Sequence, residues 1–154
     1  MSTPLEALAG VPNAAQPLPQ VVTGGQPALA HFEALKRAGV EVVLDIRDPM
    51  EPRPFDEPAL VRQLGMEYVN VSVTGGSLDD GTMERILTVL RTNAHRPVLL
   101  HCASGNRVGG PLIAHLMLDH GATQDDAIQT AMRSGLRGAD ILQWGLDFVE
   151  KQQG

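Results

Sequence analysis

The feature that most constrains the fold is a regular alternation of apolar, β-branched runs with helical patterns, which begins near residue 20. The runs expected to form strands cover residues 20–23, 40–46, 68–73 and 97–101. Strands that alternate with helices pair in parallel and carry the helices on the faces of the sheet. The sequence therefore predicts an α/β fold, a three-layer sandwich in which helices flank a central, mostly parallel sheet of four to five strands.

Capping and terminating residues indicate where the helices begin and end. Pro27 suits the first turn of a helix that Gly39 ends. Ser77 and Asp80 match the capping box of a helix that runs to about Asn93. Three further helices are expected at residues 111–120, 127–134 and 141–150. The segment 48–58 contains four prolines and four acidic residues and is expected to be a surface loop leading into a short helix.

The alternation does not extend to the start of the chain. Residues 1–19 are rich in Ala, Pro and Gln without periodicity, which predicts an extended or poorly ordered N-terminal arm. At 154 residues the chain has the length of one domain, and a domain of this size buries a substantial core. Residues 20–154 are therefore expected to form a single α/β domain.

Charge and hydropathy exclude several classes of partner. The net charge is −6 and no cluster of Lys or Arg occurs, so we expect no nucleic-acid partner. No apolar run reaches the length of a membrane span, and the N-terminus lacks the basic start and apolar segment of a secretory signal. We therefore expect no membrane partner and a cytoplasmic location.

The cysteine and histidine content limits the possible cross-links and metals. Cys102 is the only cysteine, so no disulfide within the chain is expected. The five His residues show no spacing with Asp, Glu or Cys that is typical of a metal site. We expect neither a metal nor another cofactor.

The chemistry is concentrated in one segment, His101-Cys102-Ala103-Ser104-Gly105-Asn106-Arg107, which follows a buried type of strand and leads into a helix. In parallel sheets, ligands bind beyond the carboxyl ends of the strands. A glycine-containing turn before a helix directs backbone N–H groups and the helix dipole into one concavity, which binds oxyanions such as phosphate or sulfate. The same field lowers the pKa of a cysteine thiol. Cys102 is therefore expected to be a reactive thiolate.

Other residues of this segment complete the candidate site. Arg107 presents a fixed fork of donors that can hold two oxygens of a phosphoryl group. His101 is expected to be buried and to fix the shape of the loop, since its strand position points it away from Cys102. Further candidate binding groups for the oxyanion are the amides of the intervening residues, Ala103, Ser104, Gly105 and Asn106.

This segment resembles the signature of the cysteine-dependent tyrosine and dual-specificity phosphatase superfamily, in which His-Cys opens an anion-binding loop closed by Arg. The resemblance covers about residues 20–150 and includes Thr23-Gly24-Gly25-Gln26-Pro27, Leu44-Asp45-Ile46-Arg47 and the strand at 68–73. These segments are similar to compact bacterial phosphatase-like domains that are sometimes fused to β-lactamase-fold hydrolases.

The resemblance implies a hydrolase that acts on phosphomonoesters, phosphotyrosine among them, through a phosphocysteine intermediate and without a cofactor. Its substrate would be a phosphorylated protein or a phosphorylated small molecule. Cys102 would attack phosphorus, Arg107 would bind the phosphoryl oxygens, and Asp79 or Asp80 would protonate the leaving group. Arg47 would support the site from behind the loop.

The sequence departs from the phosphatase pattern at two points, which keeps other functions open. Four residues separate Cys102 from Arg107 where these phosphatases have five, and Val108 stands where they usually have Ser or Thr. A loop of this shorter length is similar to that of the rhodanese sulfurtransferases, which implies a persulfide on Cys102. A third alternative is a non-catalytic module that binds phosphate or sulfate.

Overall fold

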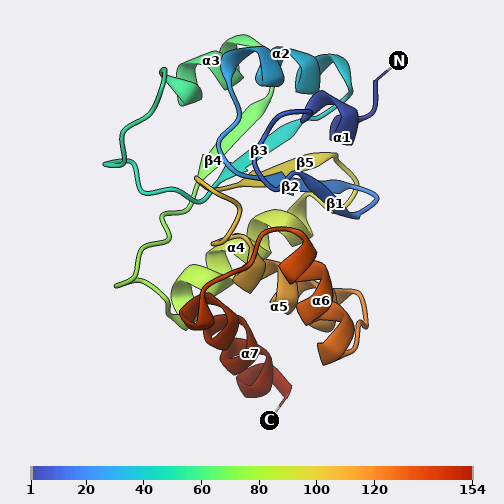
Figure 1. Cartoon of the computed structure of the whole chain (residues 1–154), viewed down its shortest axis with the longest axis vertical. Helices are drawn as coiled ribbons and strands as arrows, with labels where there is room; N and C mark the ends of the chain where they lie inside the picture. Colours follow the sequence, from blue (N-terminus) through green and yellow to red (C-terminus); the bar gives the residue numbers. More distant parts are fainter. Residues whose placement is uncertain (1, 154) are drawn as a thin grey trace.

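The sheet has five strands, as seen in a computed structural model that describes residues 2–153 (Figure 1). The spatial order of the strands is β1-β2-β5-β3-β4. Strands β2, β5, β3 and β4 run parallel, whereas β1 pairs with β2 in the antiparallel direction. The strands are β1 (Ala15–Leu18), β2 (Val21–Gly24), β3 (Val42–Asp45), β4 (Glu67–Asn70) and β5 (Val98–His101). The predicted α/β sandwich is thereby confirmed.

Helices cover both faces of the sheet, as Figure 1 shows. One face carries α1 (Pro4–Ala7), α2 (Leu29–Arg37) and α3 (Glu57–Gln63), and the other carries α4 (Asp80–Thr92), α5 (Gly109–Asp119), α6 (Gln124–Arg133) and α7 (Ala139–Gln153). Successive strand residues point to opposite faces, so β5 contributes to two separate apolar cores. Leu99 packs with Phe32 of α2, whereas Leu100 packs with residues of α4, α5 and α7. No helix within residues 2–153 is long and apolar enough to cross a membrane.

The first 19 residues differ from the expected extended or poorly ordered arm. They contain α1 and β1, and Leu8 between these two elements is fully buried. Thr3 and Glu6 form a capping box at the start of α1, which satisfies two backbone donors in a helix of a single turn. So short a helix has no room for a periodic apolar pattern, which is why the sequence appeared irregular.

The start of α4 also differs from the expected Ser77–Asp80 capping box. The cap is Asp79, whose side chain accepts a hydrogen bond from the Thr82 amide at 2.8 Å. The Ser77 hydroxyl instead accepts a hydrogen bond from the Thr74 amide in the preceding turn, at 2.9 Å. The helix therefore begins at Asp80, two residues later than a cap at Ser77 with Asp80 at the third helical position would require.

Helices α5 and α7 approach one another closely through two glycines. A Cβ atom added to Gly145 of α7 would lie 2.8 Å from the carbonyl oxygen of Gly110 and 3.2 Å from its Cα. A Cβ on Gly110 would in turn lie 2.8 Å from Cε3 of Trp144. The two glycines thus allow backbone contact between the helix that follows Cys102 and the C-terminal helix.

Candidate active site

The candidate site lies at the carboxyl end of β5, in the centre of the sheet. His101 is in register with Gly24 on β2 and with Asp45 on β3. The amide of Cys102 then donates to the carbonyl of Gly24 at 3.2 Å, which extends the pairing by one residue before the chain turns toward α5. Loops at this edge of a parallel sheet surround a ligand site, and the segment from Cys102 to Arg107, named here the Cys102–Arg107 loop, occupies that position.

The loop folds around the sulfur of Cys102. The amide of Gly105 donates a hydrogen bond to Sγ at 3.1 Å, and the φ angle of Gly105 is +101°, a conformation that favours glycine. The Cys102 side chain is fully buried at the floor of the loop. The N-cap residue of α5 is Val108, whose side chain carries no hydroxyl and makes no capping hydrogen bond.

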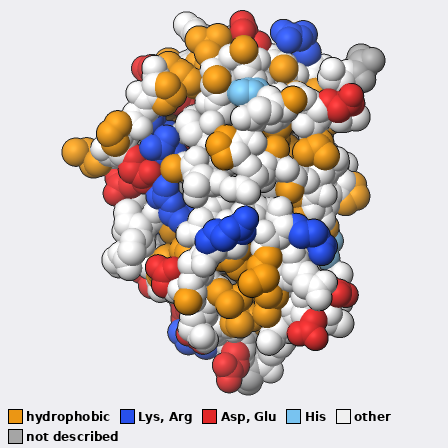
Figure 2. All heavy atoms as spheres, viewed as in Figure 1, with side chains coloured by type: hydrophobic (Ala, Val, Ile, Leu, Met, Phe, Trp, Pro, Cys, Tyr) orange, Lys and Arg blue, Asp and Glu red, His pale blue; other side chains and the backbone are white. Residues whose placement is uncertain are grey.

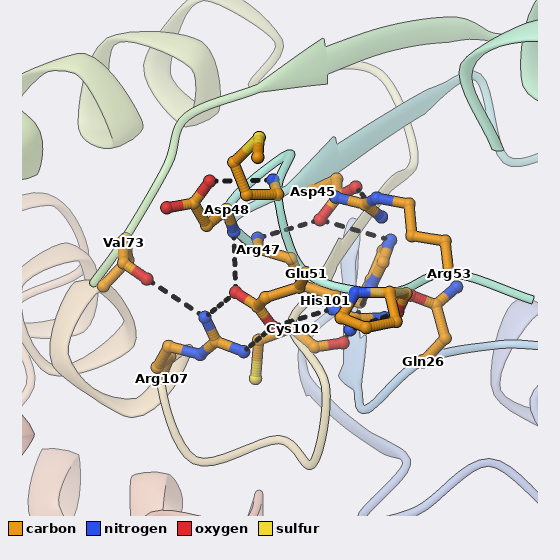
Figure 3. A network of polar contacts seen from close by, with 12 residues as sticks. Gln26, Asp45, Arg47, Asp48, Glu51, Arg53, Val73, His101, Cys102 and Arg107 are labelled. Atoms are coloured by element: carbon orange, nitrogen blue, oxygen red, sulfur yellow. Dashed lines mark hydrogen bonds and ion pairs between the residues drawn. The ribbon is translucent and has the colours of Figure 1, made fainter. Parts of the chain in front are cut away.

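Arg107 faces the same sulfur and is held by Glu51. Its two terminal nitrogens donate to the two carboxylate oxygens of Glu51 at 2.7 and 2.9 Å, and one of them also donates to the Val73 carbonyl at 3.0 Å (Figure 3). The hydrogen bond to Glu51 raises the pKa of Arg107, and the charge and proximity of Cys102 raise it further. In the other direction, the Arg107 hydrogen bond is the main cause that lowers the pKa of Glu51 to about 2.

Glu51 is therefore a site residue that the sequence did not reveal. It lies in the proline-rich segment 48–58, where its acidic character looked like that of an ordinary surface loop. Arg47, expected to support the site, contacts this residue, since its Nε donates to Glu51 at 3.1 Å. The remaining Arg47 nitrogens donate to Gln26 at 2.7 Å and to the Pro52 carbonyl at 3.0 Å.

His101 is buried behind the loop, as predicted, and contacts two oxygens. Nδ1 lies 3.0 Å from the Cys102 carbonyl and Nε2 lies 2.7 Å from a carboxylate oxygen of Glu57. Burial alone would lower the pKa of His101, but the hydrogen bond and charge of Glu57, together with the charge of Asp45, more than offset this and raise it. His101 therefore contacts Cys102 through its backbone carbonyl rather than through its thiol.

A group of buried polar side chains surrounds His101 (Figure 3). Asp45 accepts from the hydroxyl of Tyr68 and from Arg53, both at 2.6 Å. Burial, together with the hydrogen bond to Asp45 and its charge, raises the pKa of Tyr68, which keeps the phenol protonated as a donor. Three members of the group, Asp45, Glu57 and His101, are residue types that bind metals. One potential ligand atom from each lies within 4.8 Å of the other two. The guanidinium of Arg53 already supplies a cation to both carboxylates.

The outer side of the loop is fixed by three distant segments. The Asn13 side chain donates to the Ser104 carbonyl at 2.7 Å, and the Gln26 amide donates to the Ala103 carbonyl at 2.9 Å. The side-chain oxygen of Asn106 accepts from the amides of residues 137 and 138 at 2.7 and 2.8 Å. The Asn106 side chain thus anchors the loop to the start of α7 rather than pointing freely toward a ligand.

The two candidate general acids, Asp79 and Asp80, make their side-chain contacts at the start of α4 and with α7. Asp79 caps α4, and the hydrogen bonds from Thr82 lower its pKa. Asp80 pairs with Lys151 at 3.2 Å. Lys151 is twelve residues along α7 from Ala139, which at 1.5 Å per residue places it about 18 Å from the end of the helix that meets the loop. Within residues 2–153, neither carboxylate makes a hydrogen bond or ion pair with Cys102 or Arg107.

Beside the loop, the surface over α6 and α7 is apolar. Figure 2 shows a group of hydrophobic side chains on this face with Lys or Arg side chains above it. A groove here is lined by Met132, Leu136, Arg137, Gly138, Ala139 and Leu142. Because Asn106 of the loop is hydrogen-bonded to the amides of residues 137 and 138, the groove adjoins the candidate site.

The fold and the cysteine–arginine loop define a phosphatase-like α/β domain, and comparison with solved structures supports this class. The chain is similar to the protein described as "Putative phosphatase (DUF442)" from Shewanella putrefaciens, with 26% identity over 97% of this chain and 99% of that chain and a TM-score of 0.81. It is also similar to Tk-PTP, with 20% identity over 91% and 98% of the two chains and a TM-score of 0.75.

A third similar structure is TpbA from P. aeruginosa in complex with pTyr, with 19% identity, 88% of this chain and 90% of that chain covered, and a TM-score of 0.67. No protein-family model matches the sequence. No curated protein sequence matches it either. The resemblance to the cysteine-dependent tyrosine and dual-specificity phosphatases is confirmed by these structures at the level of the fold.

Proposed function

We propose that the protein is a cysteine-dependent hydrolase of phosphomonoesters borne by a protein or a small molecule. The observation that carries this proposal is the set of hydrogen-bond donors around the Cys102 sulfur. A backbone N–H donates to it at 3.1 Å, and the Arg107 guanidinium faces it at the same loop. Donors directed at sulfur stabilise a thiolate, and the same donors match the oxygens of a phosphoryl group.

The reaction would have two steps. In the first, the thiolate of Cys102 attacks phosphorus, a P–S bond forms, the P–O bond to the leaving group breaks, and the electron pair leaves with that oxygen. In the second, water attacks phosphorus, the P–S bond breaks, and inorganic phosphate and the thiolate are released. In the substrate complex, the Gly105 amide, which here donates to sulfur, would donate to a phosphoryl oxygen.

The carboxylates near the loop point to a particular leaving group. Glu51 is ionised above about pH 2 and is committed to Arg107, so it has no proton to give. Asp79 and Asp80 are engaged elsewhere. A general acid typically contributes about 10²–10⁴-fold, and a phenol, with a pKa of about 10, departs more readily without one than an alcohol does. We therefore propose aryl phosphates, phosphotyrosine among them, as the substrate class.

The proposal is tested with p-nitrophenyl phosphate and a matched alkyl phosphate. We expect hydrolysis of the aryl ester that vanadate inhibits and that Cys102→Ser abolishes, with the alkyl ester at least about 100-fold slower because no acid assists it. Arg107→Lys, which keeps the charge but loses the fork, should raise KM and lower kcat. Pure, folded protein without vanadate-sensitive turnover of either ester would refute the proposal.

A second candidate function is favoured by the four-residue spacing between Cys102 and Arg107. In a sulfurtransferase, the thiolate attacks the outer sulfur of thiosulfate, sulfite leaves, and the Cys102 persulfide then transfers its outer sulfur to cyanide. Thiocyanate release from thiosulfate and cyanide, without hydrolysis of aryl phosphate, would select this function. Phosphate or sulfate binding measured by calorimetry, without turnover in either assay, would instead indicate a non-catalytic anion-binding module.

A further inference from the structure

The buried group behind the loop contains a histidine with acceptors on both sides. His101 is fully buried, and its two ring nitrogens lie 3.0 Å from the Cys102 carbonyl and 2.7 Å from Glu57. Neither oxygen can donate when Glu57 is ionised, whereas a neutral imidazole has only one N–H. Both contacts are hydrogen bonds only if the ring carries two protons and a positive charge.

Both carboxylate oxygens of Glu57 lie against hydrogen-bond donors or the ring of His101. One oxygen accepts from Gln26 at 2.8 Å and from Arg53 at 3.4 Å, and the other lies against His101. The side chain is 1% exposed, so water contributes little to its solvation. A buried carboxylate surrounded by donors is stabilised as the anion.

The charge of Asp45 leads to the same conclusion about His101. Asp45 is fully buried and accepts from the Arg47 amide, the Tyr68 hydroxyl and the Arg53 guanidinium. Two carboxylates therefore share the cation of Arg53, which leaves one buried negative charge without a counterpart. An isolated buried charge is costly, and a protonated His101 supplies the second positive charge.

We propose that Glu57 is a positioning residue for Cys102, because it fixes the His101 ring against the Cys102 carbonyl and keeps that ring positively charged behind the sulfur. The ring is in turn bounded by Phe32 of α2, whose ring centroid lies 6.2 Å away, so it has little freedom to turn. The functional consequence, a Cys102 sulfur held for attack on phosphorus, rests on the proposed function, whereas the charge on the ring does not.

The groups that face His101 come from every element packed against it. Asp45 lies on β3, Glu57 at the start of α3, and Arg53 in the preceding loop. Tyr68 on β4 reaches the group through Asp45. Of these, only Glu57 contacts Nε2 at hydrogen-bonding distance, since Asp45 is 3.9 Å away. Glu57→Gln therefore removes the charge that the ring pairs with while keeping the size of the side chain.

The proton count on His101 is measured directly by long-range ¹H–¹⁵N correlation spectroscopy of the unmodified protein. We expect both ring nitrogens to be protonated at pH 7 and to remain so above the ordinary titration range of histidine. A ring nitrogen without a proton at pH 7 would overturn the proposal. This measurement needs no variant and no substrate.

The effect on Cys102 is measured from the ultraviolet absorbance of the thiolate, which reports one group because the chain has a single cysteine. In Glu57→Gln the midpoint of the absorbance–pH curve should rise by about one pH unit, a tenfold loss of thiolate on the acid side of the midpoint. Glu57→Asp should restore part of this shift. The matched control is Tyr68→Phe, which perturbs the same buried group without touching the Glu57–His101 pair and should leave the midpoint in place.

Each outcome separates this inference from the proposed hydrolysis. A midpoint that shifts as expected in a protein without phosphatase activity would support the role of Glu57 and refute the hydrolase. An active enzyme whose thiolate midpoint is the same in Glu57→Gln as in the unmodified chain would refute the role of Glu57 and support the hydrolase. If Glu57→Gln does not fold, the ¹H–¹⁵N measurement on the unmodified protein decides the charge of His101.

Discussion

Replacing Gly145 by alanine should destabilise the protein, although alanine is the better helix former. A Cβ at Gly145 would lie 2.8 Å from the carbonyl oxygen of Gly110, and that oxygen belongs to backbone that cannot rotate away. Since ordinary contact begins at 3.4 Å, α5 and α7 would have to separate by about 0.6 Å along that direction. The separation would also loosen the packing of Trp144 against Gly110.

Two opposing effects set the size of the change. Overpacking of this kind costs about 1–3 kcal/mol, whereas glycine to alanine in a helix interior gains up to about 1 kcal/mol. The free energy of unfolding should therefore fall by about 1–2 kcal/mol, which for a chain of this length lowers Tm by roughly 2–8 °C. The matched control is Gly81→Ala in α4, where the nearest atoms to an added Cβ are side-chain atoms at 3.7 and 3.8 Å. It should gain about 0.5 kcal/mol, because only the helix preference changes there.

The assay is thermal and urea unfolding of both variants beside the unmodified protein, followed by circular dichroism. The signs of the two changes should be opposite. A Gly145→Ala protein that melts at or above the unmodified temperature would show that α5 and α7 have room between them, and the reasoning from the glycine contact would fail.

Two further predictions concern charged residues at and near the site. The pKa of Glu51 is lowered to about 2 in the folded protein, so its contribution to stability is fully present above the ordinary range of a glutamate and is lost as the pH falls toward 2. Glu51→Gln should flatten the decline in Tm between about pH 5 and pH 2 relative to the unmodified protein, and an unchanged decline would contradict the ion pair with Arg107. Asp79→Ala should lower the urea midpoint through loss of the α4 cap, whereas Asp80→Ala, which removes an exposed ion pair, should leave the midpoint nearly unchanged. Equal effects in urea unfolding would argue against Asp79 as the cap of α4.

The sequence predicted the features of the molecule that depend on local patterns. The apolar strands, the order of strands and helices, and the position of Cys102 in a glycine-containing loop before a helix all follow from neighbours within a few residues. Arg107 also falls within this range, since it closes the same loop. The structure confirms this architecture because buried parallel strands leave few alternatives for such a pattern.

The residues that the sequence did not reveal are those whose partners are far away along the chain. Glu51 is 56 residues from Arg107, and Glu57 is 44 residues from His101. Glu51 lies in a proline-rich loop and Glu57 begins the short helix α3 that follows it, and the acidic residues of this segment have no periodicity that could link them to the site. Asp79 and Asp80 illustrate a different difficulty, because adjacent residues of one type satisfy the same capping rule and only the backbone conformation at Asp79 separates them.

The bond from Asn13 to the Ser104 carbonyl bears on how far this protein can be shortened. A chain cut at residue 20, where the strand–helix repeats begin, would keep every parallel strand but would lose Ala7, Leu8 and Val11 from the apolar core that contains Phe32. It would also lose the Asn13 hydrogen bond that holds the Cys102–Arg107 loop, together with the β1 strand that pairs with the outer edge of β2. The minimal unit that preserves the geometry around Cys102 is thus larger than the minimal unit suggested by the repeating pattern.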